Sequence, residues 1–405
     1  MGSHFNWPKK ILVHDYSGHA FTAQLARELA RQGRQVCYVS FAGFSSPKGK
    51  VSGSQADPDN FKAVELNIDV PLNKENLIKR AWQQQQYKRK LDRLIREERP
   101  DAIISANAPL EVQRAVSRYC VANGASFLFW FQDVHSEAIE RILSKRSRLL
   151  GMAAGWFYRR MEIRTLRRSA AIVAITEAFR DLIIRWRIDS AHVEVIQNWA
   201  AINDIPLRPR DNEWVRQNMP GDRLRIVYSG TLARKHNPDV VLHLARAVDA
   251  DIYVFSEGAA PDQIRQMAAS EGLHNVFVRS WVPIDQFPDM LAGADILFAM
   301  IEKDASAFSV PSKILSYLAA GRPILASIPA ENLACQTIKS AQAGLVSAPD
   351  DIHGLIFQAQ TLLADDALRS RFSENGRKHA EEWFDVETIA QRFLKVLQSS
   401  RAPRT

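Results

Sequence analysis

The chain has 405 residues, which is too long for one ordinary hydrophobic core, so two domains of about 150–200 residues each are expected. Its 46% apolar and 24% charged residues are typical of a globular protein, and no apolar run approaches the roughly 18 residues of a membrane-spanning helix. The three scattered cysteines form no C-x-x-C pair, and the first eight residues lack a signal-peptide pattern, so a cytoplasmic protein without a disulfide framework or zinc site is expected.

The net charge of +8 is unevenly placed, because residues 1–200 carry +11 and residues 201–405 carry −3. Such asymmetry indicates that the two halves face different partners. The basic half suits nucleic acid or an anionic membrane surface, unless it is only a solvated surface.

The first half of the chain alternates apolar runs typical of strands with stretches typical of helices. Residues 11–14 and 36–41 predict strands, and between them Phe21, Leu25 and Leu29 recur every four positions on a helix that ends at Gly33. Further strands are predicted over 101–105, 126–131 and 170–175, and further helices over 74–98, 109–122 and 137–168.

The alternation restarts in the second half. Strands are predicted over 224–229, 251–255, 276–279, 296–300, 323–326 and 344–347, and helices over 238–248, 261–271, 285–293, 312–320, 331–341, 351–364, 366–380 and 385–399. Two such β–α blocks predict an α/β protein of two doubly wound, mostly parallel sheets. The expected divisions are an N-terminal domain over 1–200, a proline-punctuated linker over 201–222, a C-terminal domain over 223–380, and a last helix within 381–405 that returns toward the N-terminal domain.

The first strand leads into Gly18, just before the helix over 20–32. This stretch is not a G-x-G-x-x-G dinucleotide fingerprint. Gly18 would still let the backbone approach a ligand at a helix start that favours anions, although it could serve only as a turn residue.

A small-residue loop with two adjacent cations follows the strand over 224–229. Gly230 and Thr231 open the loop, Arg234, Lys235 and His236 continue it, and Asn237-Pro238 suits the start of a helix. Cations beside a helix start form an anion site, and a diphosphate is a natural occupant. The alternative is an exposed basic loop.

A second helix start lies at Pro311-Ser312-Lys313, and this helix ends at Gly321. The free amides of its first turn and the Lys313 ammonium predict another anion site. Two helix starts of this kind, each following a strand of the same predicted sheet, strengthen the prediction of an anion site.

These stretches resemble the family-4 type of retaining glycosyltransferases with the GT-B fold, and in particular bacterial transferases of surface polysaccharide and exopolysaccharide assembly. The resemblance lies in residues 14–33, 131–133, 175–179, 195–199, 228–238, 256–258, 308–323 and 330–333. It implies two Rossmann-like domains that face an interdomain cleft, an acceptor bound by the first, and a nucleoside-diphosphate sugar (UDP or GDP) bound by the second, with no further cofactor.

The resemblance also implies roles for individual residues. Arg234 and Lys235 correspond to the basic loop that grips the donor diphosphate, and Ser312 and Lys313 to the helix start that touches the same phosphates. The donor site that it implies comprises Gly18, Gly230, Thr231, His236, Glu257, Pro311, Ser312, Lys313, Ser316, Glu331 and Asn332.

The chain departs from the family at the E-x₇-E pair that many members carry. Phe308 holds the first position and Ser316 the second, where a glutamate usually binds the nucleotide ribose. Ser316 could make only a neutral hydrogen bond, and Glu302 or Asp304 could supply the missing carboxylate.

The expected reaction transfers a sugar to a hydroxyl acceptor with retained anomeric configuration. Arg234 and Lys235 would stabilise the leaving diphosphate where other transferases use a metal ion, and no metal is expected. Asp133 or His135 could take the acceptor proton, the donor phosphate is the alternative base, and Asp133 could instead only cap the next helix.

Cations and large apolar residues are interleaved over 141–168, where nine Lys and Arg meet one acid, Glu162. Such a segment can lie in an anionic interface. We therefore expect peripheral binding to the inner face of the cytoplasmic membrane and a lipid-linked or oligosaccharide acceptor, unless these apolar residues pack on the protein's own sheet.

Three other functions remain open on the sequence alone. A nucleotide-sugar epimerase could use the same two-domain plan, and the departure at Ser316 keeps a non-catalytic sugar-nucleotide-binding partner possible. Nucleic-acid binding has no helix-turn-helix, RNA-recognition or zinc-finger pattern to support it, so no nucleic-acid partner is expected.

Overall fold

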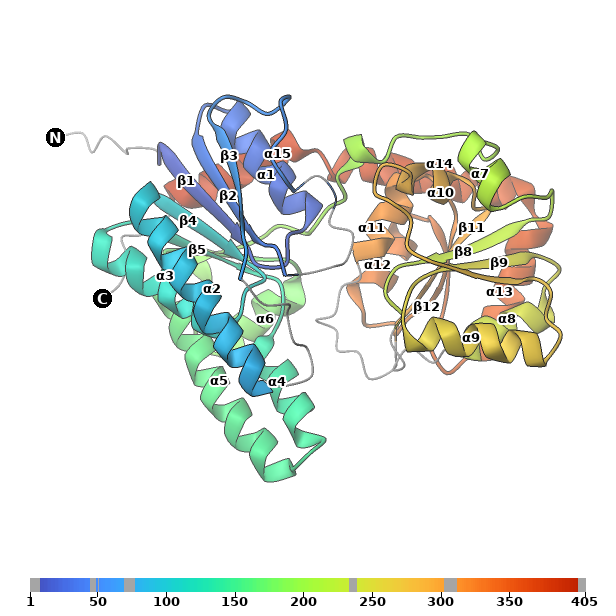
Figure 1. The fold of residues 1–405 in the computed structure, drawn as a ribbon, viewed down its shortest axis with the longest axis horizontal. Coiled ribbons are helices and arrows are strands. Elements are labelled where there is room, and N and C mark those ends of the chain that lie inside the picture. Colours follow the sequence, from blue (N-terminus) through green and yellow to red (C-terminus); the bar gives the residue numbers. More distant parts are fainter. Residues whose placement is uncertain are drawn as a thin grey trace. The chain divides into compact units, whose positions relative to one another are not determined.

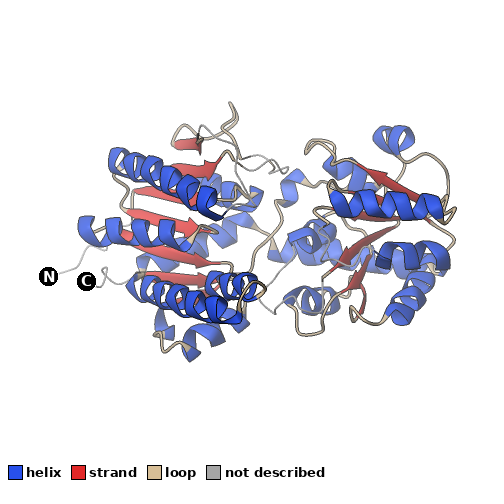
Figure 2. Cartoon of the chain, turned by 60° about the horizontal axis from the view of Figure 1, so that its bottom comes forward, coloured by secondary structure: helices blue, strands red, loops and turns tan. Residues whose placement is uncertain are grey.

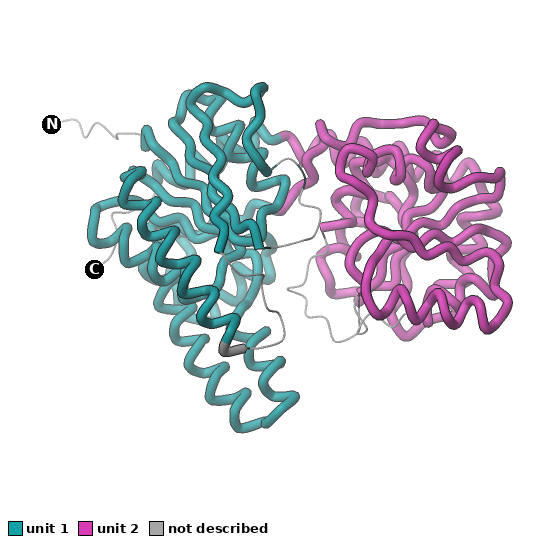
Figure 3. The backbone as a smooth tube through the Cα atoms, viewed as in Figure 1, with its two compact units in different colours: residues 1–197, 386–405 teal, residues 198–385 magenta. Residues whose placement is uncertain are grey.

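The computed structural model describes residues 8–43, 49, 51–68, 77–232, 239–301 and 312–399. Its contacts divide the chain into two units (Figure 3), one formed by Met1–Gln197 with Val386–Thr405 and the other by Asn198–Asp385. The chain therefore passes from the first unit to the second and back again. In each unit the strands lie between layers of helices (Figure 2).

The first unit is built on a parallel sheet of seven described strands in the order β3-β2-β1-β4-β5-β6-β7. Strand β1 pairs with β2 on one side and with the central strand β4 on the other, so that Val13 lies beside both Tyr38 and Ile104. Of the seven strands, β1, β2 and β4 are buried on both faces, which explains their apolar runs, whereas the edge strand β3 is partly exposed. Their bounds are β1 (Lys10–Asp15), β2 (Gln35–Phe41), β3 (Phe61–Leu66), β4 (Ala102–Ala106), β5 (Ser126–Phe131), β6 (Ala171–Ala174) and β7 (Val193–Val195).

The helices of the first unit bury apolar stripes against this sheet. In α1, Phe21, Leu25 and Leu29 are buried as their four-residue spacing predicts. The helices are α1 (Ala20–Arg31), α2 (Leu77–Glu98), α3 (Leu110–Asn123), α4 (His135–Ser144), α5 (Arg148–Arg168), α6 (Glu177–Arg185) and α15 (Val386–Gln398). The last of these, α15, packs against α1 and places Phe393 against Trp130 with ring centroids 4.8 Å apart.

The single helix predicted over 137–168 is wrong, because the chain forms two helices, α4 and α5, joined by a short turn. Ser147 begins α5, and its hydroxyl accepts a hydrogen bond from the Leu150 amide. Gly151 and Gly155 let the two helices pack closely, since a Cβ at either position would meet Ser144 or Glu140 at less than 3 Å. The result is an antiparallel hairpin that extends beyond the edge of the sheet (Figure 1).

The second unit is built on a parallel sheet of six described strands in the order β10-β9-β8-β11-β12-β13. The strands are β8 (Arg225–Ser229), β9 (Asp251–Phe255), β10 (Val276–Arg279), β11 (Ile296–Met300), β12 (Ile324–Ser327) and β13 (Gly344–Ser347). The helices are α7 (Glu213–Asn218), α8 (Asp239–Ala247), α9 (Ala259–Ser270), α10 (Phe287–Ala292), α11 (Ser312–Ala319), α12 (Leu333–Ser340), α13 (Ile352–Ala364) and α14 (Asp366–Trp383).

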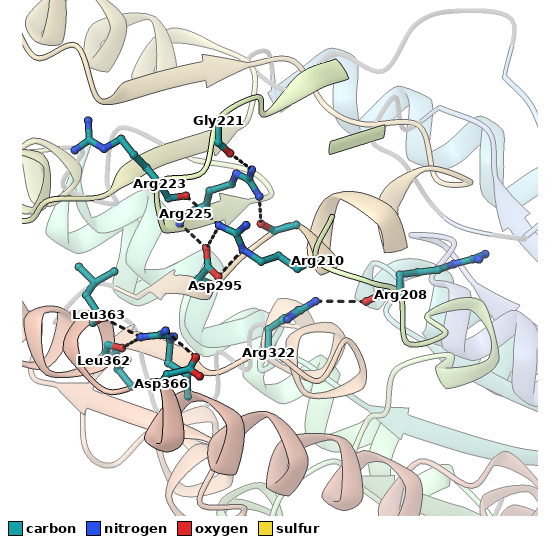
Figure 4. Close-up of polar contacts among 12 residues, drawn as sticks. Arg208, Arg210, Gly221, Arg223, Arg225, Asp295, Arg322, Leu362, Leu363 and Asp366 are labelled. Atoms are coloured by element: carbon teal, nitrogen blue, oxygen red, sulfur yellow. Dashed lines mark hydrogen bonds and ion pairs between the residues drawn. The ribbon is translucent and has the colours of Figure 1, made fainter. Parts of the chain in front are cut away.

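A network of arginines around Asp295 fixes the start of the second unit to its sheet (Figure 4). Arg210 donates two hydrogen bonds to the Asp295 carboxylate, at 2.7 and 2.9 Å, and the Arg225 amide donates a third at 2.8 Å. The Arg225 guanidinium donates to the carbonyls of Gly221 and Gly293. The polar stretch before β8 is thus hydrogen-bonded to strands of the sheet rather than extended as a free linker.

None of the described helices is both long enough and apolar enough to cross a bilayer. The three cysteines are buried free thiols. The sequence missed β3, β7, α6 and α7, which are short or lie at sheet edges where the apolar pattern is weak.

Candidate functional site

The site predicted in the second half lies at the carboxyl edge of the second sheet. Because its strands are parallel, the loops after β8, β9, β11 and β12 leave from this same edge. The strand order reverses between β8 and β11, and ligands of open α/β sheets bind beside such a reversal. Gly230 and Thr231 follow β8, Glu257 follows β9, Ser312 and Lys313 begin α11 after β11, and Glu331 and Asn332 follow β12.

Gly230 gives the turn after β8 its shape. Its φ of +124° lies in the region that favours glycine, and its amide donates to the Phe255 carbonyl at 3.1 Å. One turn further on, the Leu232 amide donates to the Ser256 hydroxyl at 3.1 Å. These bonds hold the start of the loop against the end of β9.

Lys313 fills the space in front of Gly230. A Cβ at position 230 would lie 3.3 Å from the Lys313 Nζ, and this ammonium lies 3.8 Å from the centroid of the Tyr228 ring. The cation–π contact holds the ammonium at the strand end. Because the surrounding protein desolvates the partly buried Lys313 side chain, its pKa falls to about 7. An anionic ligand here would favour the charged form.

Two buried tyrosines that sequence reasoning missed support this arrangement. Tyr317 lies four residues after Lys313 on α11; its hydroxyl accepts from the Ser229 amide at 3.1 Å and lies 3.3 Å from the carbonyls of Ser229 and Phe298. The Tyr228 hydroxyl donates to the Thr231 carbonyl at 2.9 Å. The four-residue spacing of Lys313 and Tyr317 was the available signal, since it places both on one side of a helix.

The other predicted donor residues in the second unit have varied surroundings. Thr231, Glu257, Ser312 and Glu331 are exposed, and Ser316 is partly buried. The Glu257 carboxylate accepts from the Trp281 amide at 3.4 Å. Asn332 is fully buried and caps α12, accepting from the Ala334 amide at 2.9 Å.

Several predicted residues lie outside the described part of the chain. They are Arg234, Lys235, His236 and Pro311 of the predicted site, together with Glu302, Asp304 and Phe308.

The first sheet also reverses its strand order, between β1 and β4, and Asp15 ends β1 there. The Asp15 carboxylate is fully buried and accepts hydrogen bonds from the Ser17 amide at 3.1 Å and from Thr22 Oγ1 at 2.5 Å, while His19 Nδ1 lies 3.1 Å away. Burial opposes ionisation, but His19 and Thr22 hold the pKa of Asp15 below its ordinary value. Gly18 has a φ of +72° in this turn. Sequence reasoning singled out Gly18 and missed Asp15 and His19.

Asp133 follows β5 at the same edge as Asp15 and is exposed. Although the residue as a whole is exposed, the surrounding protein desolvates its carboxyl and raises its pKa, and the nearby His135 and His19 oppose that rise. Asp133 does not cap α4 with its side chain, so that alternative is wrong. Glu162 of α5 takes this role instead, accepting from the His135 and Ser136 amides at 3.1 and 3.2 Å and from the Ser136 hydroxyl.

In the part of the chain that the structure describes, no group of three or more His, Cys, Asp or Glu could hold a metal ion. Asp57 and Asp59 form an Asp-x-Asp pair in the sequence, and Asp57 is engaged in an ion pair with Arg27 that is 2.6 Å long.

Two family models match the chain in series. The "Glycosyl transferase 4-like domain" matches residues 18–199, and "Glycosyl transferases group 1" matches residues 210–379. Both models describe glycosyltransferases, and together they cover most of the chain, which has the GT-B fold. The two parallel sheets are the Rossmann-like domains of that fold.

Curated relatives of this GT-B chain share modest identity with it. It is 25% identical over 202 residues to YtcC of Bacillus subtilis, named as a glycosyltransferase, covering 45% of this chain and 47% of YtcC. It is 20% identical over 234 residues to WcaI of Escherichia coli, named as a colanic acid biosynthesis glycosyl transferase, covering 56% of each. The chain thus matches about half the length of these relatives.

Solved structures share the GT-B fold across nearly the whole chain. Sucrose-phosphate synthase from Thermosynechococcus elongatus has a TM-score of 0.72 at 14% identity, covering 96% of this chain and 98% of its own. Anabaena HepE in complex with UDP has a TM-score of 0.68 at 15% identity, covering 96% and 100%. A Listeria monocytogenes protein named as a UDP-N-acetylglucosamine 2-epimerase has a TM-score of 0.62 at 12% identity, covering 98% and 99%.

Proposed function

We propose that this GT-B chain transfers a sugar from a nucleoside-diphosphate sugar, with UDP or GDP as the nucleotide, to a hydroxyl of a lipid-linked or oligosaccharide acceptor. The observation that carries the proposal is the Lys313 ammonium, held in front of Gly230 where the strand order of the second sheet reverses. A cation beside the first turn of α11 suits a diphosphate. The complex of HepE with UDP supports the choice of nucleotide class.

In the proposed reaction the anomeric configuration is retained and no metal ion takes part. Charge develops on the diphosphate as its bond to the sugar breaks, and preorganised cations lower the energy of that state. Lys313 supplies one such cation, and Arg234 and Lys235 are assigned the same task from the sequence. No other cofactor enters the proposal.

The acceptor is assigned to the first unit, where Asp133 and His135 follow β5. Either side chain can accept the proton of the attacking hydroxyl, and the donor phosphate is the alternative base. Replacing Asp133 by alanine separates these choices. A large loss of kcat without a change in donor affinity supports Asp133, whereas unchanged turnover leaves His135 or the donor phosphate as the base.

The proposed pathway is assembly of a bacterial surface polysaccharide or exopolysaccharide, on the inner face of the cytoplasmic membrane. The name of WcaI and the basic, apolar surface of α5 support this placement.

Lys313→Met tests the donor site directly. Loss of a charge-assisted contact should weaken binding of the preferred nucleoside-diphosphate sugar by about 10- to 100-fold, as measured by calorimetry. The pKa of about 7 also predicts a pH dependence, because above that pH binding must first return a proton to Lys313. Wild-type affinity should therefore fall by up to about tenfold per pH unit above 7, and this slope should vanish in the variant.

Lys339→Met is the matched control, since Lys339 is an exposed lysine in the last turn of α12. It should bind the nucleotide sugar like the wild type. Equal binding by Lys313→Met and wild type, with the same pH slope, would refute the assigned donor site.

The epimerase alternative is favoured by one observation, the likeness of fold to the Listeria protein. Product analysis separates the two activities. Free epimerised sugar nucleotide would establish the epimerase, a glycosylated acceptor the transferase, and binding without turnover of any nucleotide sugar a non-catalytic partner.

A further inference from the structure

Large apolar side chains are exposed on the α4–α5 hairpin to an unusual extent. Six of the twelve large apolar residues that are exposed in the described chain lie on these two helices. The alternative that the apolar residues of 141–168 pack on the protein's own sheet is therefore wrong for these six, whereas Met161 and Leu166 of the same segment are buried. Clustered exposure of this kind marks an interaction surface. The six are Ile142, Leu149, Leu150, Met152, Trp156 and Phe157, with exposed fractions from 51% to 79%.

A basic groove adjoins this apolar surface. It lies between α3 and α5, has a volume of about 470 Å³, and is bounded at one end by Trp156 and Phe157. The described residues that line it include no aspartate or glutamate. Five arginines line it, namely Arg114 and Arg118 of α3 and Arg160, Arg164 and Arg168 of α5.

The acids near these helices are already engaged elsewhere. Glu162 points away from the groove and binds the first turn of α4, and Glu140 pairs with Arg159 at 2.9 Å. Within the described ranges, none of the five groove arginines forms an ion pair. The groove therefore gathers five arginines without an ion pair to a described side chain, and the nearby Glu111 of α3 interacts with Tyr158 of α5.

Two further observations indicate that the groove is shaped for a ligand. The Arg160 guanidinium lies 4.8 Å from the centroid of the Trp156 ring, which orients it at the groove mouth. The Ser117 hydroxyl lines the groove, is 1% exposed, and has no hydrogen-bond partner among the described residues. A buried hydroxyl in this state needs a partner from outside the chain.

The spacing of the arginines suits phosphate groups. Arg160, Arg164 and Arg168 recur every four residues, so successive side chains leave one side of α5 about 6 Å apart along its axis. Each guanidinium offers a planar fork of donors that matches phosphate oxygens. Repeated, singly charged headgroups fit such a row.

We propose that the α3–α5 groove binds the phosphate groups of anionic phospholipids while the apolar residues of the α4–α5 hairpin enter the surface of the same bilayer. This inference rests on the membrane location proposed above and names the residues that would hold the protein at the membrane. Lys145, Arg146 and Arg148 at the end of the hairpin would stay among the headgroups, so the hairpin lies in the interface rather than across the bilayer. Nucleic acid would leave the adjoining apolar residues without a partner.

Co-sedimentation with vesicles tests the site, using the full chain without donor or acceptor. Wild type should bind vesicles that mix phosphatidylglycerol into phosphatidylcholine and should release them as salt is raised, but it should not bind phosphatidylcholine alone. Arg160→Gln with Arg164→Gln should lower the affinity by about 10- to 30-fold. The double variant Arg371→Gln with Lys378→Gln on α14 removes the same charge from exposed sites and should bind like the wild type.

Insertion is tested by fluorescence quenching with phospholipids brominated in their acyl chains. Wild type should be quenched on binding, and Trp156→Phe should lose part of that quenching while still binding. Leu149→Ser with Leu150→Ser should weaken binding and leave its salt dependence in place, because the arginines remain. Each variant is first checked for an unchanged melting temperature.

Three results would overturn the proposal. In the first, the double variant of Arg160 and Arg164 binds the anionic vesicles as tightly as the wild type does. In the second, millimolar inorganic phosphate displaces the protein from the vesicles. In the third, RNA binds through the same arginines as tightly as the vesicles do, or more tightly. Because no sugar is transferred in these assays, such a result would leave the proposed transferase activity intact.

Discussion

Arginine side chains gather in two places in this protein, around Asp295 in the second unit and between α3 and α5 in the first. Around Asp295 the guanidinium of Arg210 is hydrogen-bonded to the carboxylate, which raises the pKa of Arg210, and Arg225 donates to backbone carbonyls. Between α3 and α5 the arginines meet no acid in the described chain. The same residue thus serves the fold in one place and is available to a ligand in the other.

The contrast shows what a charge count misses. Residues 201–405 carry a net charge of −3, and the arginines around Asp295 form hydrogen bonds within the second unit. The first half carries +11, and a row of those charges lines one groove beside exposed aromatic residues. Partner geometry, rather than charge alone, separates structural arginines from binding ones.

Asp295→Ala should have the largest effect on stability. The substitution removes the acceptor of the Arg210 guanidinium and the Arg225 amide, and the Asp295 side chain is only 9% exposed. We expect a loss of about 2–4 kcal/mol, or roughly 6–12 °C in the melting temperature measured by calorimetry. Asp249→Ala is the control, because Asp249 also pairs with an arginine, Arg223, but is 98% exposed; its effect should stay below about 2 °C. Equal effects of the two variants would remove the structural role given to Asp295.

Glu162→Ala should have an intermediate effect that is confined to the hairpin. It removes the acceptor of the His135 and Ser136 amides at the start of α4, a loss of about 1–2 kcal/mol. Faster hydrogen exchange in residues 135–144, with unchanged exchange in the second unit, is the expected result. Glu140→Ala removes a partly exposed acid from the same hairpin and should change this exchange less. Uniformly faster exchange throughout the first unit would contradict the local role.

Arg160→Gln with Arg164→Gln should have the smallest effect on stability. Since neither arginine forms an ion pair in the described structure, we expect the melting temperature to shift by less than about 2 °C. At low salt the shift should be upward, because two like charges four residues apart repel one another. A fall as large as that of Asp295→Ala would show that the groove arginines hold the fold, and the comparison would fail.

Much of the fold could be predicted because the strands are buried on both faces and the helices on one. Those conditions produce the unbroken runs of β1, β4 and β5 and the four-residue repeat of α1. The same logic failed between residues 137 and 168, where the pattern runs through the turn at 145–147 without interruption. The close glycines Gly151 and Gly155 are the signal that a second helix packs there.

The candidate site was predictable where it depends on local chain features and not where it depends on distant ones. Gly230, Ser312 and Lys313 could be placed from strand ends and helix starts. The bond from the Ser229 amide to Tyr317 joins residues 88 positions apart, and no local pattern encodes it. Whether Trp156 and Phe157 face solvent or the core was equally undetermined, because both arrangements use the same amphipathic repeat.

The return of α15 to the first unit has a consequence for how the chain folds during synthesis. All of residues 198–385 leave the ribosome before α15 does, so the second unit can finish folding while the first still lacks a helix. Until then the Trp130 ring has no Phe393 beside it, and Glu194 and the Val195 carbonyl lack their bonds from Arg392, each 2.7 Å long in the finished protein. The half of the protein that is made first is therefore completed last, which reverses the usual N-terminal-first order of domain folding.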